Sequence, residues 1–184
     1  MDDFKVTESK QVYSGRVVTL SVETIILPGG VKTVREAVHH RGAAAIVPMI
    51  SGDELLLIRQ FRYCAGKTLW EIPAGTLEPG EQPIACAMRE LIEETGYRAG
   101  KMRPIGGFYA SPGFCDEFIH LFVATNLELC DSGPEGKDND EQIEVHRVSL
   151  EDALGKIENG DIVDGKTIVS LMKVSSMIRG SGTT

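Results

Sequence analysis

The chain has 184 residues, enough for one sizeable hydrophobic core and too few for two full domains. Its 27 acidic against 19 basic side chains give a formal net charge of −8, which disfavours nucleic-acid binding through bulk attraction because such proteins usually carry a basic stripe. No apolar run approaches the roughly 20 residues of a membrane-spanning helix, the N-terminus lacks a signal-peptide core, and the four cysteines form no CxxC pair. We therefore expect a cytoplasmic protein without zinc or disulfides that binds neither nucleic acid nor membranes.

Two strand-like segments, residues 16–27 and 31–39, flank the turn sequence LPGG and predict an antiparallel β-hairpin. An isolated hairpin is only marginally stable in water, so we expect this one to pack on the main domain, on a second copy of the chain, or on both. The sequence thus predicts an N-terminal β-module over residues 1–41 and a main domain over residues 42–184.

The main domain begins with two predicted strands, residues 43–50 and 54–61, joined by a turn. Arg59 and Arg62, at the end of the second strand, are expected to share one face. Two neighbouring guanidinium groups repel each other unless an anion lies between them, and their planar fork suits a pyrophosphate. Pairing with the chain's own surplus acids is the alternative.

A helix is predicted from Pro83 up to Gly96. Proline suits the first helical position, and a glycine just past the last periodic residue supplies a left-handed cap. Upstream, Pro73 excludes helix and Gly75 allows the chain to turn back. The apolar residues that recur at helical spacing, and that we expect to form its buried stripe, are Ile84, Met88, Leu91 and Ile92.

Acidic side chains crowd the C-terminal end of this helix. Glu90, Glu93 and Glu94 are three and four positions apart, so they are neighbours, and each like-charge pair costs the helix roughly 0.2–0.5 kcal/mol. The helix dipole disfavours each acid there by a further ~0.3–1 kcal/mol. An acidic helix face is often only solvated. A divalent cation such as Mg²⁺ or Mn²⁺, which prefers hard oxygen ligands, explains this cluster better.

The stretch from Gly75 to Tyr97, GTLEPGEQPIACAMRELIEETGY, resembles the Nudix box, and every charged and glycine position of that pattern is matched. The resemblance implies an α/β fold, namely an α/β/α sandwich with a mixed sheet. It also implies hydrolysis of a nucleoside diphosphate linked to another group, with Mg²⁺ as cofactor and Mn²⁺ as a substitute. The implied metal ligands are the carbonyl of Ala74 and the carboxylates of Glu90, Glu93, Glu94 and Glu141, and Arg89 is the partner that orients the glutamates.

Pro112 lies sixteen residues beyond Gly96, within the sequence SPG. A proline at this offset resembles the sequence signature of the ADP-ribose pyrophosphatase branch of the Nudix family. That branch carries an N-terminal β-module and dimerises by exchanging it, which implies a homodimer. The implied substrate is ADP-ribose, cleaved to AMP and ribose 5-phosphate. Another nucleoside diphosphate sugar, such as GDP-mannose or UDP-glucose, and a sensor without hydrolysis are the alternatives. The implied substrate contacts are Arg35, Glu36, Arg59, Arg62, Ser111, Pro112, Gly113 and Glu117.

The acidic segment 130–142 has no apolar periodicity and predicts a loop. By the resemblance, a metal-binding carboxylate and a general base lie here, and Glu141 aligns with the metal ligand. The base position falls near Asn139, which cannot usefully accept a proton, so Asp140, Glu141 and Glu93 are the candidates. Further strands are predicted at 102–110, 118–125 and 143–148, and helices at 149–160 and 167–178.

Overall fold

The computed structural model describes residues 4–130 and 143–181. The chain divides into two compact units, of which the first comprises residues 1–42 and 108–118 and the second comprises residues 43–107 and 119–184. The predicted division is linear, whereas the first unit also takes in residues 108–118 from the middle of the chain.

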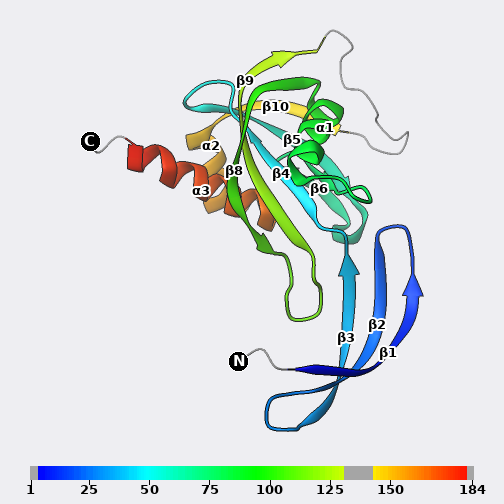
Figure 1. Cartoon of the computed structure of the whole chain (residues 1–184). Helices are drawn as coiled ribbons and strands as arrows, with labels where there is room; N and C mark the ends of the chain where they lie inside the picture. Colours follow the sequence, from blue (N-terminus) through cyan, green and yellow to red (C-terminus); the bar gives the residue numbers. More distant parts are fainter. Residues whose placement is uncertain (1–3, 131–142, 182–184) are drawn as a thin grey trace. The chain divides into compact units, whose positions relative to one another are not determined.

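The first unit contains an antiparallel sheet with the strand order β1-β2-β3 (Figure 1). The predicted hairpin is present as β2 (Val18–Ile26) and β3 (Lys32–His40). Gly29 and Gly30 in the turn adopt φ values of 92° and 84°, which favour glycine. Strand β1 (Lys5–Ser14) was not predicted, because all ten of its residues are exposed and no buried face marks the strand in the sequence.

The segment 108–118 is bound to β3 by backbone hydrogen bonds. The Val38 amide donates to the Phe114 carbonyl at 2.7 Å, and the Asp116 amide donates to the Val38 carbonyl at 3.1 Å. The carboxylate of Asp116 also accepts from the backbone amide of His40 at 2.7 Å. These bonds explain why this segment groups with the N-terminal strands.

Two sheets form the second unit. The mixed sheet has the order β7-β4-β9-β8, in which β4 is antiparallel to β7 and parallel to β9. The second sheet is antiparallel and has the order β10-β5-β6, with a short 3-10 turn, Tyr63–Ala65, between β5 and β6. The strand bounds are β4 Ala43–Pro48, β5 Glu54–Arg62, β6 Lys67–Glu71, β7 Ala74–Thr76, β8 Tyr97–Tyr109, β9 Phe118–Leu129 and β10 Ile143–Ser149.

Helices cover both faces of the second unit's strands. Figure 1 shows α1 (Pro83–Thr95) on one side and α2 (Leu150–Glu158) with α3 (Gly165–Ser181) on the other. All six residues of β4 are buried, as expected of a strand covered on both faces. This arrangement is the predicted α/β/α sandwich.

The buried face of α1 differs from the prediction. The helix begins at Pro83 and ends in a left-handed cap at Gly96, as expected, but Ile84 and Met88 are 41% and 44% exposed. Leu91 is buried as predicted, but Cys86 and Ala87 take the places expected of Ile84 and Met88, and all three pack against Ala44, Ile46, Leu77, Phe122 and Ala124. Small side chains let the helix lie close to β4, so size rather than hydrophobicity selects the packed face.

Arg59 and Arg62 do not share a face, and the prediction that they would was wrong. They are three positions apart, and side chains alternate along a strand. The guanidinium of Arg59 lies 5.3 Å from the centroid of the Trp70 ring and forms an ion pair with Glu144 at 3.3 Å. Arg62 pairs with Glu71. Each arginine therefore binds an acid of the chain, which is the alternative that the sequence left open.

Candidate active site

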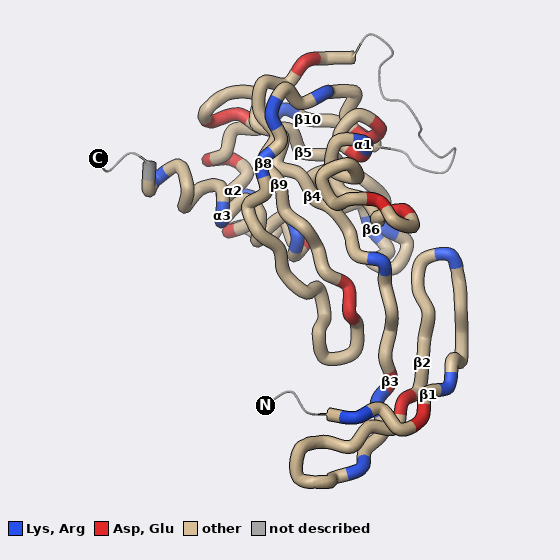
Figure 2. The backbone as a smooth tube through the Cα atoms, in the orientation of Figure 1, with Lys and Arg blue, Asp and Glu red and all other residues tan. Residues whose placement is uncertain are grey.

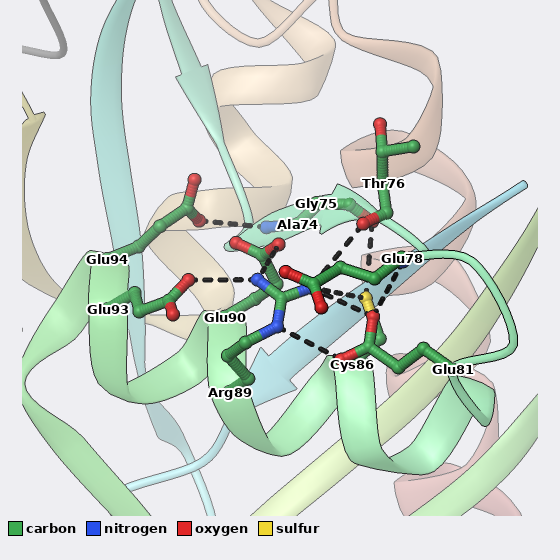
Figure 3. Close-up of polar contacts among 10 residues, drawn as sticks. All are labelled: Ala74, Gly75, Thr76, Glu78, Glu81, Cys86, Arg89, Glu90, Glu93 and Glu94. Carbon is green, nitrogen blue, oxygen red and sulfur yellow. Dashed lines mark hydrogen bonds and ion pairs between the residues drawn. The ribbon is translucent and has the colours of Figure 1, made fainter. Parts of the chain in front are cut away.

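Arg89 lies at the centre of the acidic cluster on α1 (Figure 3). Its Nε and Nη2 each donate to Glu81 at 3.0 Å, and its Nη1 donates to Glu90 at 2.6 Å and to Glu93 at 2.9 Å. The hydrogen bonds from Arg89 lower the pKa of Glu81 to about 2, and the bond to Glu81 is the main cause that raises the pKa of Arg89. One cation thus orients three carboxylates.

Glu94 connects the end of α1 to β7. Its side chain is only 5% exposed, and Oε2 accepts a hydrogen bond from the backbone amide of Ala74 at 2.9 Å. The structure therefore brings together Glu94 and the residue whose carbonyl was predicted as a metal ligand, although the two are twenty positions apart (Figure 3).

Gly75 leaves the space that the Glu90 carboxylate occupies. A Cβ added at this position would lie 1.8 Å from Glu90 Oε1 and 2.0 Å from its Cδ. Any residue other than glycine would therefore displace the Glu90 carboxylate. The Gly75 carbonyl also accepts from the Sγ of Cys86 at 3.6 Å. Burial raises the pKa of that thiol to about 12, so Cys86 is a packing residue here and not a nucleophile.

The chemistry of these donors fits a hard divalent cation. Figure 2 shows acidic residues gathered on α1 and in the segment before it. The carboxylates of Glu90, Glu93 and Glu94 and the Ala74 carbonyl are oxygen ligands of the kind that Mg²⁺ takes. Within residues 4–130 and 143–181, no three His, Cys, Asp or Glu side chains are already arranged around a common metal position. The predicted residues Asp140 and Glu141 lie outside the described residues.

A second ionic cluster surrounds Glu71 at the end of β6. Its carboxylate is 1% exposed and accepts from Arg62 Nε at 2.8 Å and from Nη2 at 2.7 Å. Burial alone would raise the pKa of Glu71, but the hydrogen bond from Arg62 and the charge of Lys166 hold it below its usual value. Sequence reasoning missed Glu71, although an acid between apolar residues of a predicted strand region is a usable signal.

The first turn of α3 completes this second cluster. Lys166 Nζ donates to Glu71 Oε2 and forms an ion pair with Asp164 at 3.1 Å. Thr167 Oγ1 donates to Asp164 at 2.5 Å and accepts from the buried Ile72 amide at 2.9 Å. Lys166 lies 95 positions from Glu71, so no local pattern in the sequence could connect them.

The first unit holds a separate cavity of about 460 Å³. Its lining includes four of the predicted substrate contacts, namely Arg35, Glu36, Pro112 and Gly113. Two other predicted contacts, Ser111 and Glu117, do not line it, and the carboxylate of Glu117 lies 3.6 Å from His40 Nδ1. The structure thus brings distant parts of the sequence, β3 and the SPG turn, to one cavity.

The side chains of Ser21, His39 and Asp116 in the first unit form a hydrogen-bonded row that has a structural and not a catalytic role. His39 contacts Ser21 Oγ through Nε2 at 3.0 Å and Asp116 through Nδ1 at 2.8 Å. However, Ser21 is 4% exposed, and its hydroxyl donates to Glu23 at 3.0 Å. A buried hydroxyl whose proton is already donated to a carboxylate cannot attack a substrate, so the row ties strand β2 to the segment 108–118.

A protein-family comparison settles the family. The model described as NUDIX domain matches residues 39–170. This chain belongs to the NUDIX family. The match includes both the Arg89 cluster and the Glu71 cluster, and it begins at His39 in the last strand of the N-terminal sheet.

Curated relatives of this NUDIX chain carry three names. It is 43% identical to the ADP-ribose pyrophosphatase of Bacillus subtilis (strain 168) and 40% identical to the methanol dehydrogenase activator of Bacillus methanolicus, in each case over 91% of this chain and 90% of the relative. It is 36% identical to the GDP-mannose pyrophosphatase of Citrobacter koseri over 78% of each chain. A solved structure titled as that of an ADP compounds hydrolase has the same fold, with a TM-score of 0.86, 23% identity and coverage of 100% and 98%.

Two expectations from composition can be compared with the structure. All four cysteines are free, which agrees with the prediction of no disulfides. In the described part of the chain, no helix combines the length and apolar character needed to cross a bilayer.

Proposed function

We propose that this NUDIX protein hydrolyses the diphosphate bond of ADP-ribose to AMP and ribose 5-phosphate, with Mg²⁺ as its cofactor. The observation that carries the proposal is the cluster of four glutamates, Glu81, Glu90, Glu93 and Glu94, fixed by Arg89 and the Ala74 amide. The 43% identity to an ADP-ribose pyrophosphatase over nine-tenths of both chains supports this choice of substrate.

The metal would be held by the Ala74 carbonyl and by Glu90, Glu93 and Glu94, with Glu141 as a further candidate. When bound, Mg²⁺ offsets the charge of the diphosphate and makes a water more acidic. Arg89 acts on the glutamates, because its three ion pairs fix the directions of their carboxylates. Outer partners of this kind typically change metal affinity or activity by about 10–100-fold when removed.

The reaction needs one water and one proton acceptor. The water oxygen forms a bond to one phosphorus while the bond from that phosphorus to the bridging oxygen breaks, and the second phosphate leaves with the bridging oxygen. A carboxylate takes the proton from the water, a contribution of ~10²–10⁴ in rate. Among the residues that the structure describes, Glu93 is the candidate for this proton acceptor, since its side chain is 31% exposed and can reach a water. Asp140 and Glu141 are further candidates and lie outside the described residues.

Arg62 is the proposed phosphate contact in the second unit. Its side chain is 37% exposed, and its guanidinium is held on one edge by Glu71. We propose no such role for Arg59, because its guanidinium is already bound by Glu144 and stacked on Trp70.

The cavity of the first unit is proposed to contribute to substrate recognition through Arg35, Glu36, Pro112 and Gly113. Ser111 and Glu117 then act indirectly, since neither lines the cavity. The Ser111 carbonyl accepts hydrogen bonds from the amides of Phe114 and Cys115 and so shapes the turn. An Arg35→Ala change is expected to raise KM and leave Mg²⁺ dependence unchanged.

A homodimer is the proposed assembly, and a cytoplasmic location is proposed with it. Strand β1 is an edge strand, and large apolar side chains in and beside it are exposed: Phe4 by 60%, Val12 by 56% and Tyr13 by 58%. An exposed apolar edge strand favours pairing with another chain. Light scattering on a size-exclusion column tests this, and a Val12→Lys, Tyr13→Lys variant that stays a dimer would contradict the role of β1.

A hydrolase of another nucleoside diphosphate sugar is the second candidate, and the 36% identity to a GDP-mannose pyrophosphatase supports it. The deciding experiment is phosphate-coupled turnover of ADP-ribose, GDP-mannose and UDP-glucose, each with Mg²⁺ and with EDTA. We expect the highest kcat/KM with ADP-ribose and no turnover in EDTA, with recovery on adding Mg²⁺. A preference for GDP-mannose would select the second candidate, and no turnover with any of the three would contradict hydrolysis.

A further inference from the structure

The Glu71 cluster lies beside the metal-binding residues but binds no metal in the proposed function. Its central carboxylate is buried, and a buried charge is stable only when it is paired and hydrogen-bonded. Both oxygens of Glu71 are engaged: Oε1 by Arg62 Nε, and Oε2 by Arg62 Nη2 and by Lys166 Nζ. A single buried acid therefore holds two cations in fixed places.

The orientation of Arg62 follows from this pairing. Glu71 binds the Nε and Nη2 edge of the guanidinium in bidentate fashion, the geometry in which an arginine fork is most rigid. Among the described residues, no hydrogen bond from Nη1 is seen. Because the Arg62 side chain is 37% exposed, the Nη1 side of its guanidinium is the side that remains for an anionic ligand.

The first turn of α3 fixes the same stretch of backbone that the metal-binding residues use. Thr167 Oγ1 accepts from the Ile72 amide, and Lys166 holds the Glu71 side chain. Two residues further on, the Ala74 amide donates to Glu94. The stretch from Glu71 to Ala74 therefore connects Arg62, Lys166 and Glu94.

We propose that Lys166 and Glu71 are positioning residues for Arg62, and that Lys166 directs the Arg62 guanidinium toward the diphosphate by fixing Glu71. This inference rests on the proposed function and deepens it, since it assigns a role to α3 in binding the phosphate groups. Lys166 Nζ pairs with Glu71 and Asp164, so we expect its removal to leave the metal affinity intact.

The test compares Lys166→Met and Lys166→Arg with Lys173→Met, a control in which the lysine is exposed on the same helix. Glu71→Gln is the second variant, which keeps the volume and removes the charge. The readouts are kcat and KM for ADP-ribose, AMP binding by calorimetry, Mn²⁺ binding and the midpoint of thermal unfolding. AMP binding keeps the test independent of turnover.

We expect Lys166→Met and Glu71→Gln to weaken AMP binding and lower kcat/KM by about 10–100-fold, the range typical of outer-shell partners. Mn²⁺ affinity stays within about twofold, Lys166→Arg recovers most of the loss, and Lys173→Met matches the wild type. Normal AMP binding and kcat/KM in both variants would overturn the inference and leave the proposed function intact. A wild type that neither binds AMP nor turns over ADP-ribose would overturn both.

Discussion

The second unit contains two ionic clusters of opposite design. In the first, the single cation Arg89 binds three carboxylates, those of Glu81, Glu90 and Glu93. In the second, the single buried carboxylate of Glu71 binds two cations, Arg62 and Lys166, and Asp164 balances Lys166. The first cluster keeps a surplus of negative charge and the second is neutral.

The difference between the clusters follows from what each has to bind. A surplus of carboxylates is costly for a folded protein unless a cation joins them, so the Arg89 cluster is suited to a divalent metal. A neutral cluster around a buried acid costs less and holds an arginine in a fixed direction, which suits an anion. Changes to the two clusters should therefore affect metal binding and phosphate binding separately.

The largest effect is expected from Glu94→Gln. This change removes a charge from the proposed metal site while keeping the size of the side chain, and we expect kcat to fall by about 10³-fold, at the upper end of the losses seen when a charge-stabilising group is removed. Steady-state kinetics with ADP-ribose measures the loss. Glu128→Gln, on the exposed end of β9, is the control and should keep full activity. Retention of most activity in Glu94→Gln would remove Glu94 from the metal site.

Gly75→Ala tests whether the space beside Glu90 is required. The new Cβ would have to lie 1.8 Å from Glu90 Oε1, so the carboxylate must move away. We expect Mn²⁺ affinity and kcat/KM to fall by about 10–100-fold, the range for displaced metal ligands and their partners. Gly52→Ala is the control, since a Cβ there meets nothing within 4 Å. Unchanged Mn²⁺ affinity in Gly75→Ala would show that Glu90 does not bind the metal.

Arg89→Lys separates charge from geometry in the first cluster. Lysine keeps the positive charge, but it cannot bind three carboxylates through a planar fork. We expect Mn²⁺ affinity to fall by about tenfold, the lower end of the range for outer-shell partners, and AMP affinity to change less. Calorimetry with each ligand measures both. An equal loss for the two ligands would contradict the separation of the clusters.

Glu81→Gln gives the smallest effect, one on stability that depends on pH. The pKa of Glu81 lies at about 2 in the folded protein, below its ordinary value of 4.5, so the ionised form stabilises the fold above pH 4.5 and this stabilisation is lost as the pH falls toward 2. We expect the variant to lose about 1 kcal/mol of unfolding free energy at pH 7, less than the pKa shift alone implies because water screens the pair.

Urea unfolding of wild type and Glu81→Gln in EDTA measures this difference from pH 7 to pH 2.5. The difference should shrink steadily below pH 4.5. A difference that is constant over this range would show that the ion pair with Arg89 is not its source, and Glu128→Gln should show no difference at any pH.

Local patterns placed Arg89, Glu90 and Glu93 of the first cluster together but did not single out Glu81, and they gave none of the ion pairs of the second cluster. The helix from Pro83, the cap at Gly96 and the gathering of Glu90, Glu93 and Glu94 all follow from spacing along one helix. The mixed sheet also agreed with the prediction. In contrast, Lys166 reaches Glu71 only through the packing of α3, and no spacing in the sequence shows that contact.

Two other errors have physical causes of the same kind. The buried face of α1 was misassigned because Cys86 and Ala87 are small, and close approach to β4 favours small side chains over the larger Ile84 and Met88. Strand β1 was missed because its stability comes from hydrogen bonds to β2 and not from a buried apolar face. Tertiary packing and pairing decided these features, and neither is encoded in a short window of residues.

The hydrogen bond from the Ile72 amide to Thr167 Oγ1 has a consequence for the folding of this protein during its synthesis. A ribosome releases the Nudix box, which ends at Tyr97, about seventy residues before it releases the first turn of α3. Until that turn emerges, the strand end that carries Glu71 has no anchor from α3. A nascent chain arrested before residue 164 should therefore have lower hydrolytic activity than the full chain although its box is complete.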